Sequence, residues 1–175
     1  MSELAESTAL RLLSLLEITH KEATHLLYSW HQLFSHRQAD LDWVKGLDAR
    51  PDEAVVLEAF VSRYARLQDN IAGKLIPVWL ETLSERPASQ LENLNKAEKL
   101  GVINSVEDWL SARQVRNNLV HEYVVDPADM VDALQLAKVA TGQFFDTYNA
   151  INIYIHNTHP GLVDRLPARI IFGYV

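Results

Sequence analysis

Long stretches of this 175-residue chain carry apolar residues at the 3.6-residue period of an α-helix, and this spacing alone restricts the fold to helical classes. The first stretch runs from about Glu6 to Phe34 and contains neither Pro nor Gly. Alternation of apolar and polar residues at the period of a strand is almost absent. The sequence therefore predicts a first helix of roughly 40 Å, at about 1.5 Å per residue.

A second long helix is predicted to begin at Pro51, because Pro suits the first turn of a helix and the acidic residues beside it suit its N-terminal dipole. Pro77 should kink or end this helix, since a proline inside a helix removes a hydrogen bond and crowds the preceding turn. Asp40 could cap a short helix before it. The apolar stripe of the second helix comprises Phe60, Tyr64, Leu67, Ile71, Leu75 and Val78.

Three further helices are marked by their end residues. A short helix over 91–100 is stopped by Gly101. Ser105 resembles the cap of the next helix, and Asp126 followed by Pro127 is typical of the start of the last one. One face of that last helix carries Met130, Leu134, Ala137, Thr141, Phe144, Tyr148, Ile151 and Ile155. Its apolar surface is wider than a monomer needs, because it also includes Phe145, Ile153 and Tyr154.

These helices predict an all-α fold, an up-and-down helical bundle of four to five main helices. A chain of this length suffices for one well-buried core, so residues 1–158 are expected to form a single domain. Residues 159–175 read as an irregular C-terminal tail or docking arm. Its last apolar run, Ile170-Ile171-Phe172, is expected to form a short strand or to dock on the bundle.

Composition excludes several classes of protein. The chain contains no cysteine, which excludes a disulfide scaffold, a thiolate metal site and a cysteine nucleophile. The formal net charge of −7 argues against indiscriminate nucleic-acid binding, although a local basic cleft is compatible with it. No signal peptide and no run of about 20 apolar residues is visible, so a cytoplasmic protein without a membrane span is expected.

Four histidines between residues 20 and 36 raise the question of a metal site. His20 and His31 are eleven residues apart, as are His25 and His36, which places the members of each pair three turns from one another. Neighbours five residues apart diverge by about 140° around a helix. Neither arrangement brings ligands around one ion, so we predict no metal site.

The stretch from Arg113 to Tyr123 mixes polar and apolar residues in an unusual way. On an ideal helix with about 100° per residue, one strip carries the residues expected to face solvent, namely Glu107, Ser111, Gln114, Asn118 and Glu122. A different arc joins Arg113, Arg116, Asn117, His121 and Tyr123 with Val106, Trp109, Leu110 and Val120. Because burying an unpaired Arg or imidazole costs several kcal/mol, this arc is expected to line a cleft or a subunit interface.

Within this stretch the chain reads Arg-x4-His-x-Tyr, with Asn117 directly after Arg116. This pattern resembles the HEPN superfamily of small helical-bundle proteins, which is recognised by an Arg-x4–6-His motif with a polar residue after the Arg. Segments around 60–75 and from Glu98 to Gly101 are similar to one bacterial branch of that family. The resemblance covers about Val55 to Asp126.

The resemblance implies a homodimer in which the motifs of two subunits face a shared cleft. Many members are metal-independent ribonucleases without a cofactor, often toxins paired with a minimal nucleotidyltransferase antitoxin. Others act as non-catalytic subunits that bind a nucleotide or the nucleotidyltransferase partner. Carried over to this chain, the motif makes Arg116 and His121 catalytic and Asn117 supporting. It also makes Tyr123 the site to which the partner adds AMP.

The residue types suit this chemistry independently of the resemblance. Metal-free RNA cleavage needs a group that moves a proton near pH 7 and a cation that stabilises charge at phosphorus. His121 can do the first, and the guanidinium of Arg116 matches the oxygens of a phosphate. The two side chains lie about 140° apart on an ideal helix. They would therefore flank a cleft, which a second subunit would complete.

A basic stripe on the second helix could supply further phosphate contacts. Arg63, Arg66 and Lys74, with Asn70 between them, follow one another at spacings of three or four residues. Together with Arg113 they are the predicted RNA-binding cations if the stripe borders the cleft. Asp69 lies off the stripe and is expected to be the structural partner of an arginine.

Each of these interpretations has a structural alternative. Arg116 could pair with a carboxylate such as Asp69 while His121 donates to a backbone carbonyl, as in buried networks of helical bundles. Tyr123 could be an ordinary core or interface tyrosine. The stripe from Arg63 to Lys74 could be a solvated helix face.

Overall fold

The computed structural model describes residues 3–121 and 126–173, and this part of the chain is helical without strands. Helix α1 spans Glu3–Phe34, a short α2 spans Leu41–Lys45, and a 3₁₀ turn at Leu47–Ala49 leads into α3, Pro51–Asn70. Then follow α4 at Ile76–Thr82, α5 at Gln90–Lys99, α6 at Val106–His121 and α7 at Pro127–Thr158. The expected all-α bundle is confirmed.

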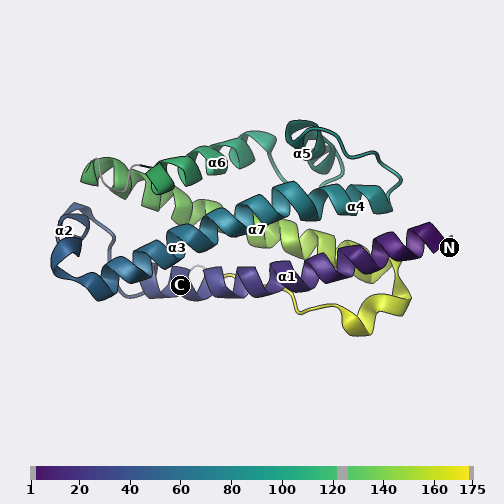
Figure 1. The fold of residues 1–175 in the computed structure, drawn as a ribbon, viewed down its shortest axis with the longest axis horizontal. Coiled ribbons are helices and arrows are strands. Elements are labelled where there is room, and N and C mark those ends of the chain that lie inside the picture. Colours follow the sequence, from purple (N-terminus) through teal and green to yellow (C-terminus); the bar gives the residue numbers. More distant parts are fainter. Residues whose placement is uncertain (1–2, 122–125, 174–175) are drawn as a thin grey trace.

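The long helices run up and down (Figure 1), with α3 and α4 packed along α1, and α6 and α7 completing the bundle. Short α5 lies at the end of the bundle where α4 ends and α6 begins. The core is aromatic where these helices meet. Phe144 of α7 lies with its ring centroid 4.9 Å from that of Tyr64 on α3 and 5.2 Å from that of Trp109 on α6.

Local chemistry explains several helix ends. The Asp40 carboxylate accepts from the backbone N–H of Trp43, and the Asp126 carboxylate accepts from that of Ala128. The Ser105 hydroxyl likewise accepts from the N–H of Asp108. Gly101 adopts a positive φ of 75° at the end of α5, a conformation that side chains with a Cβ rarely adopt. These side chains and Gly101 confirm the three helix starts and the one helix end that the sequence predicts.

Pro77 behaves differently from the prediction that it would kink or end a regular α-helix. A π-helical turn at Ile71–Leu75 joins α3 to α4, and the backbone N–H of Ile76 donates to the carbonyl of Ile71. Pro77 is then near the start of α4, where its missing N–H is best tolerated. The wide turn thus carries the helix past the proline as far as Thr82.

The chain beyond α7 packs back on the bundle as a docking arm, 166–173, after a 3₁₀ segment at Pro160–Arg165. Asn149 of α7 donates to the carbonyl of Ile170 (2.8 Å) and accepts from its N–H (2.9 Å). Tyr148 donates to the carbonyl of Ala168 at 2.9 Å, and burial raises the pKa of its phenol to about 12. The arm forms no strand in its described part, so of the two expectations docking is the one found.

The arm covers part of the wide apolar surface of α7, whereas Leu136 and Val139 of the same helix stay exposed at 59% and 64%. The ring of Phe172 lies 5.1 Å from those of both Trp30 and Phe145, so the arm covers the fully buried Phe145. Tyr154 packs edge-on against Trp79, at 5.9 Å between ring centroids. Of the three additional residues only Ile153 is substantially exposed, at 41%.

Replacing Asn149 by Ala is expected to destabilise the protein by about 1–3 kcal/mol, because both polar groups of the Ile170 backbone lose their partner in a half-buried place. Urea unfolding followed by circular dichroism measures the change. Asn104→Ala, at an exposed bend, is the matched control and should leave stability nearly unchanged. Equal losses in the two variants would show that the arm adds nothing to stability.

Candidate functional site

Helix α6 carries the Arg-x4-His motif and is held to the bundle by its apolar side. Trp109, Ala112 and Leu119 are almost fully buried. The hydroxyl of Tyr64 on α3 donates to the carbonyl of Ala112 at 3.2 Å, and burial raises the pKa of this phenol. The position of α6 is therefore fixed against α3 and α7 along its buried side.

Arg116 lies at the seam between α6 and α3. Its Nη2 pairs with the Asp69 carboxylate at 2.5 Å, and its Nη1 donates to the side-chain carbonyl of Asn117 at 3.0 Å. The side chains of Arg116 and Asp69 are 29% and 54% exposed, so solvent reaches the pair. Asp69 is thus the partner of an arginine, as expected. The alternative interpretation, in which Arg116 forms a structural ion pair with a carboxylate such as Asp69, describes the same pairing.

The rest of the arc is less enclosed than its mixture of residues suggests. Leu110 and Val120 are 43% and 49% exposed. Arg113 is exposed and donates to the side-chain carbonyl of Gln90 on α5 at 2.8 Å. The outward side of α6 therefore presents apolar side chains next to cationic ones, and the described chain itself does not cover them.

The two remaining motif residues are described incompletely or not at all. His121 is the last residue of α6, so its backbone is placed at the end of the helix, about one turn after Asn117. Its side chain, like Tyr123, lies outside the described residues. The roles of His121 and Tyr123 remain predictions.

The basic stripe of the second helix faces α1 rather than the motif. The guanidinium of Arg63 donates to the carbonyl of His25 at 3.2 Å and to the hydroxyl of Ser29. Arg66 and Lys74 interact electrostatically with Glu22, also on α1. The condition that the stripe borders the Arg116 cleft is therefore not met within one subunit. A helix has several faces, and only packing decides which neighbour each one meets.

Between the cations of this stripe, Asn70 is almost fully buried. Its amide donates to the Glu22 carboxylate at 2.8 Å and to the hydroxyl of Thr19 at 3.1 Å. Partial burial raises the pKa of Glu22, while the hydrogen bond from Asn70 and the nearby cations Arg66 and Lys74 oppose the shift. The stripe is thus a polar link between α1 and α3.

This raised pKa predicts a pH-dependent effect of Glu22→Gln. In the wild type, stability falls as the pH rises from the unfolded-state pKa of Glu22 through its folded-state pKa, because the unfolded chain ionises this group more easily. The Gln side chain does not ionise, so the variant does not lose stability in this way. The stability of Glu22→Gln relative to wild type should therefore increase between a pH below 4.5 and pH 7. Urea unfolding of the wild type and the variant at the low pH and at pH 7 measures this difference in stability. Glu17→Gln, at an exposed position, is the control. A difference independent of pH would contradict the prediction.

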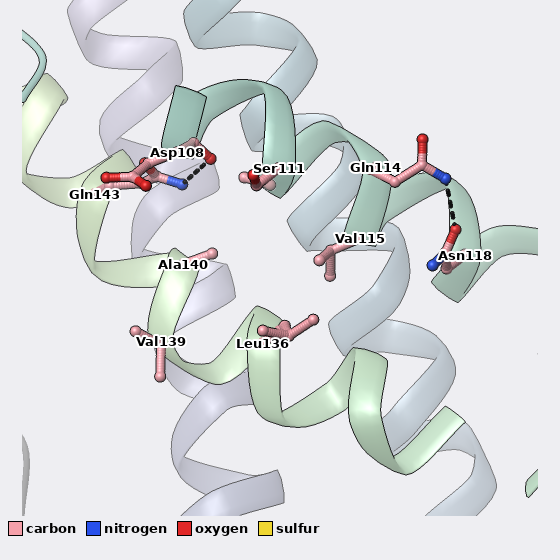
Figure 2. Close-up of a pocket in the computed structure, with 10 residues that line it drawn as sticks. Asp108, Ser111, Gln114, Val115, Asn118, Leu136, Val139, Ala140 and Gln143 are labelled. Atoms are coloured by element: carbon pink, nitrogen blue, oxygen red, sulfur yellow. Dashed lines mark hydrogen bonds between the residues drawn. The ribbon is translucent and has the colours of Figure 1, made fainter. Parts of the chain in front are cut away.

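Two grooves flank α6. The groove between α6 and α7 has a volume of about 570 Å³ (Figure 2). Leu136 of α7 faces Val115 across it, and Val139 and Ala140 also line it, while Gln114 and Asn118 are hydrogen-bonded to each other at its rim. Ser111 and Gln114, on the strip of α6 predicted to face solvent, are indeed exposed. They also border a groove, and the periodicity of one helix could not reveal this because α7 forms the other wall.

The second groove, of about 500 Å³, lies between α3 and α6, on the flank of α6 that carries Arg116. Its lining residues are Glu58, Val61, Ser62, Ala65, Leu119 and Val120. The α3 residues of this groove are not predicted from the sequence. Their spacing of three and four residues on the way to Asp69 places them on one helix face, but many helix faces share this pattern.

Among residues 3–121 and 126–173, no three His, Asp or Glu side chains are grouped closely enough to hold a metal ion. Over the same residues, none of the helices combines the length and apolar character that crossing a membrane requires. Comparisons of the chain with models of protein families, with curated proteins and with solved structures found no match.

Proposed function

We propose that this chain is a metal-independent endoribonuclease of the HEPN type that acts as a homodimer. In this proposal it is the cytoplasmic toxin half of a pair with a minimal nucleotidyltransferase antitoxin. The proposal rests above all on the placement of Arg116 and Asn117, side by side and partly exposed to solvent, on the last turns of the helix that ends at His121.

The proposed reaction is transesterification of an RNA phosphodiester. The 2′-hydroxyl oxygen attacks the adjacent phosphorus, His121 takes up its proton, and the bond to the 5′-oxygen breaks as that oxygen gains a proton from the protonated His121 of the partner subunit. The Arg116 guanidinium neutralises the charge that develops on the phosphate oxygens. For this it must exchange the surface-exposed Asp69 carboxylate for phosphate, which costs little because exposed ion pairs contribute only about 0–1 kcal/mol.

Dimerisation would provide the second His–Arg set. Support comes from the exposed Leu110 and Val120 beside the motif, since apolar side chains next to functional cations are typical of surfaces that a partner covers. In the same dimer the predicted phosphate contacts at Arg113 would border the shared cleft.

The test is incubation of the purified chain with single-stranded RNA in the presence of EDTA. We expect products ending in 2′,3′-cyclic phosphate, and a dimer in analytical ultracentrifugation. A monomer, or intact RNA at micromolar protein concentration, would refute the proposal.

A second candidate is a non-catalytic subunit that binds a nucleotide or docks the nucleotidyltransferase. The net charge of −7 and the pairing of Arg116 with Asp69 favour it, because neither favours a polyanionic substrate. It predicts calorimetric binding of a nucleotide or of the partner without RNA cleavage.

Both candidates allow the partner to modify Tyr123. Incubation with the cognate nucleotidyltransferase and ATP is expected to add the mass of AMP to the peptide that contains Tyr123, and Tyr123→Phe should prevent the addition. An adduct on another residue, found by mass spectrometry, would refute this assignment.

A further inference from the structure

The groove between α3 and α6 combines apolar walls with a carboxylate that has no partner among the described residues. Val61, Ala65, Leu119 and Val120 form its apolar part, and the side chains of Glu58 and Ser62 lie among them. Its volume of about 500 Å³ is within the usual range for small-molecule sites, about 300–1,000 Å³. Glu58 and Ser62 are exposed and have no hydrogen-bond or ion-pair partner among the described residues.

The groove continues the seam that holds the Arg116–Asp69 pair. Ala65 precedes Asp69 by one helical turn on α3, and Val120 follows Arg116 by one turn on α6, while the two helices run in opposite directions (Figure 1). The groove therefore extends from the ion pair toward the end of α6, where His121 directly follows Val120. A ligand in it would lie next to the residues proposed to hold the phosphate.

A carboxylate in such a groove would discriminate among the four RNA bases. A carboxylate offers two acceptors side by side, and the Watson–Crick edge of guanine offers two adjacent donors, N1–H and the N2 amine. In adenine and cytosine the amine is next to a ring nitrogen that accepts, and in uracil the one N–H lies between two carbonyl groups. Each of these three edges would place an acceptor against the carboxylate.

We propose that the α3–α6 groove is a guanine-binding subsite in which Glu58 accepts from N1–H and N2–H of the base and the apolar walls cover its face. The inference rests on the proposed ribonuclease function, because it makes guanosine the nucleotide beside the phosphate held by Arg116. It assigns base preference to α3, outside the Arg-x4-His motif.

The first experiment measures binding without cleavage. Titration of the wild-type chain with 5′-GMP, AMP, CMP and UMP, followed by ¹⁵N NMR, is expected to shift amides of residues 58–65 and 119–120, most strongly with GMP. Glu58→Gln should weaken GMP binding at least about 5-fold, since its amide N–H replaces one acceptor, and leave AMP binding little changed.

Ala65→Phe should fill the groove and abolish binding of all four nucleotides. Glu17→Gln on α1 is the matched control. Equal affinities for the four nucleotides in the wild type, or an unchanged GMP affinity in Glu58→Gln, would overturn the inference.

The second experiment maps cleavage positions in an RNA of mixed sequence. Cuts next to guanosine that become indiscriminate in Glu58→Gln support the subsite. Cuts that are indiscriminate in the wild type overturn the subsite and leave the ribonuclease proposal intact. If GMP binds selectively but RNA stays intact, the ribonuclease proposal fails and guanine recognition belongs to the non-catalytic candidate.

Discussion

Replacing His121 by Ala is expected to lower the rate of RNA cleavage by about 10²–10⁴-fold, the usual contribution of a general acid or base. The fold should persist, because His121 is the last residue of α6 and the buried side chains that hold this helix precede it. Initial rates on a fluorescent oligoribonucleotide measure the effect, and circular dichroism monitors the fold.

His36→Ala provides the matched control, since His36 is exposed and follows α1 in another part of the chain. It should cleave RNA like the wild type. The structural alternative for His121 makes the opposite prediction, namely a less stable protein with unchanged cleavage, so the two readouts together distinguish them. Unchanged cleavage by His121→Ala would end the enzymatic proposal.

Phe144→Ala is expected to destabilise the protein by about 3–5 kcal/mol, the largest effect we expect on stability. Phe144 is fully buried and its ring contacts both Tyr64 of α3 and Trp109 of α6, so its loss leaves a cavity at the junction of three helices. For a chain of this size, each kcal/mol corresponds to about 2–4 °C in Tm.

The matched control is Val139→Ala, on the same helix but 64% exposed, which should change stability by no more than about 0.5 kcal/mol. Thermal and urea unfolding measure both variants. A loss below about 1 kcal/mol for Phe144→Ala would contradict the packing described for α6. Because α6 carries the motif, the same variant should also cleave RNA less well near its Tm.

What the sequence predicts well is what neighbouring residues determine. Asp40, Ser105 and Asp126 cap their helices through side chains that reach the next turn, and Gly101 supplies a backbone conformation that other residues resist. These features need no knowledge of the rest of the chain, and their positions in the structure agree with the prediction.

What could not be predicted depends on which elements meet. Arg63 carries the same charge whether its side of α3 faces α1 or α6, and only packing places it on Ser29. Likewise, the spacing of Leu110 and Val120 puts them on an apolar arc but does not show that the described chain leaves them exposed. The sequence placed Phe145 on apolar surface that the bundle would leave uncovered. It is covered by the C-terminal arm, whose irregular sequence does not show where it packs.

The π turn at Ile71–Leu75 has a consequence for how length changes act on this fold. It holds one residue more than an α turn, so the hydrophobic frames before and after it are offset by one position, about 100°. Both frames face the same core because the wide turn accommodates the extra residue. Removing one residue here should therefore restore an α turn and leave the buried Trp79 and Leu80 facing the core, whereas adding a second residue should rotate them away from it by about 100°.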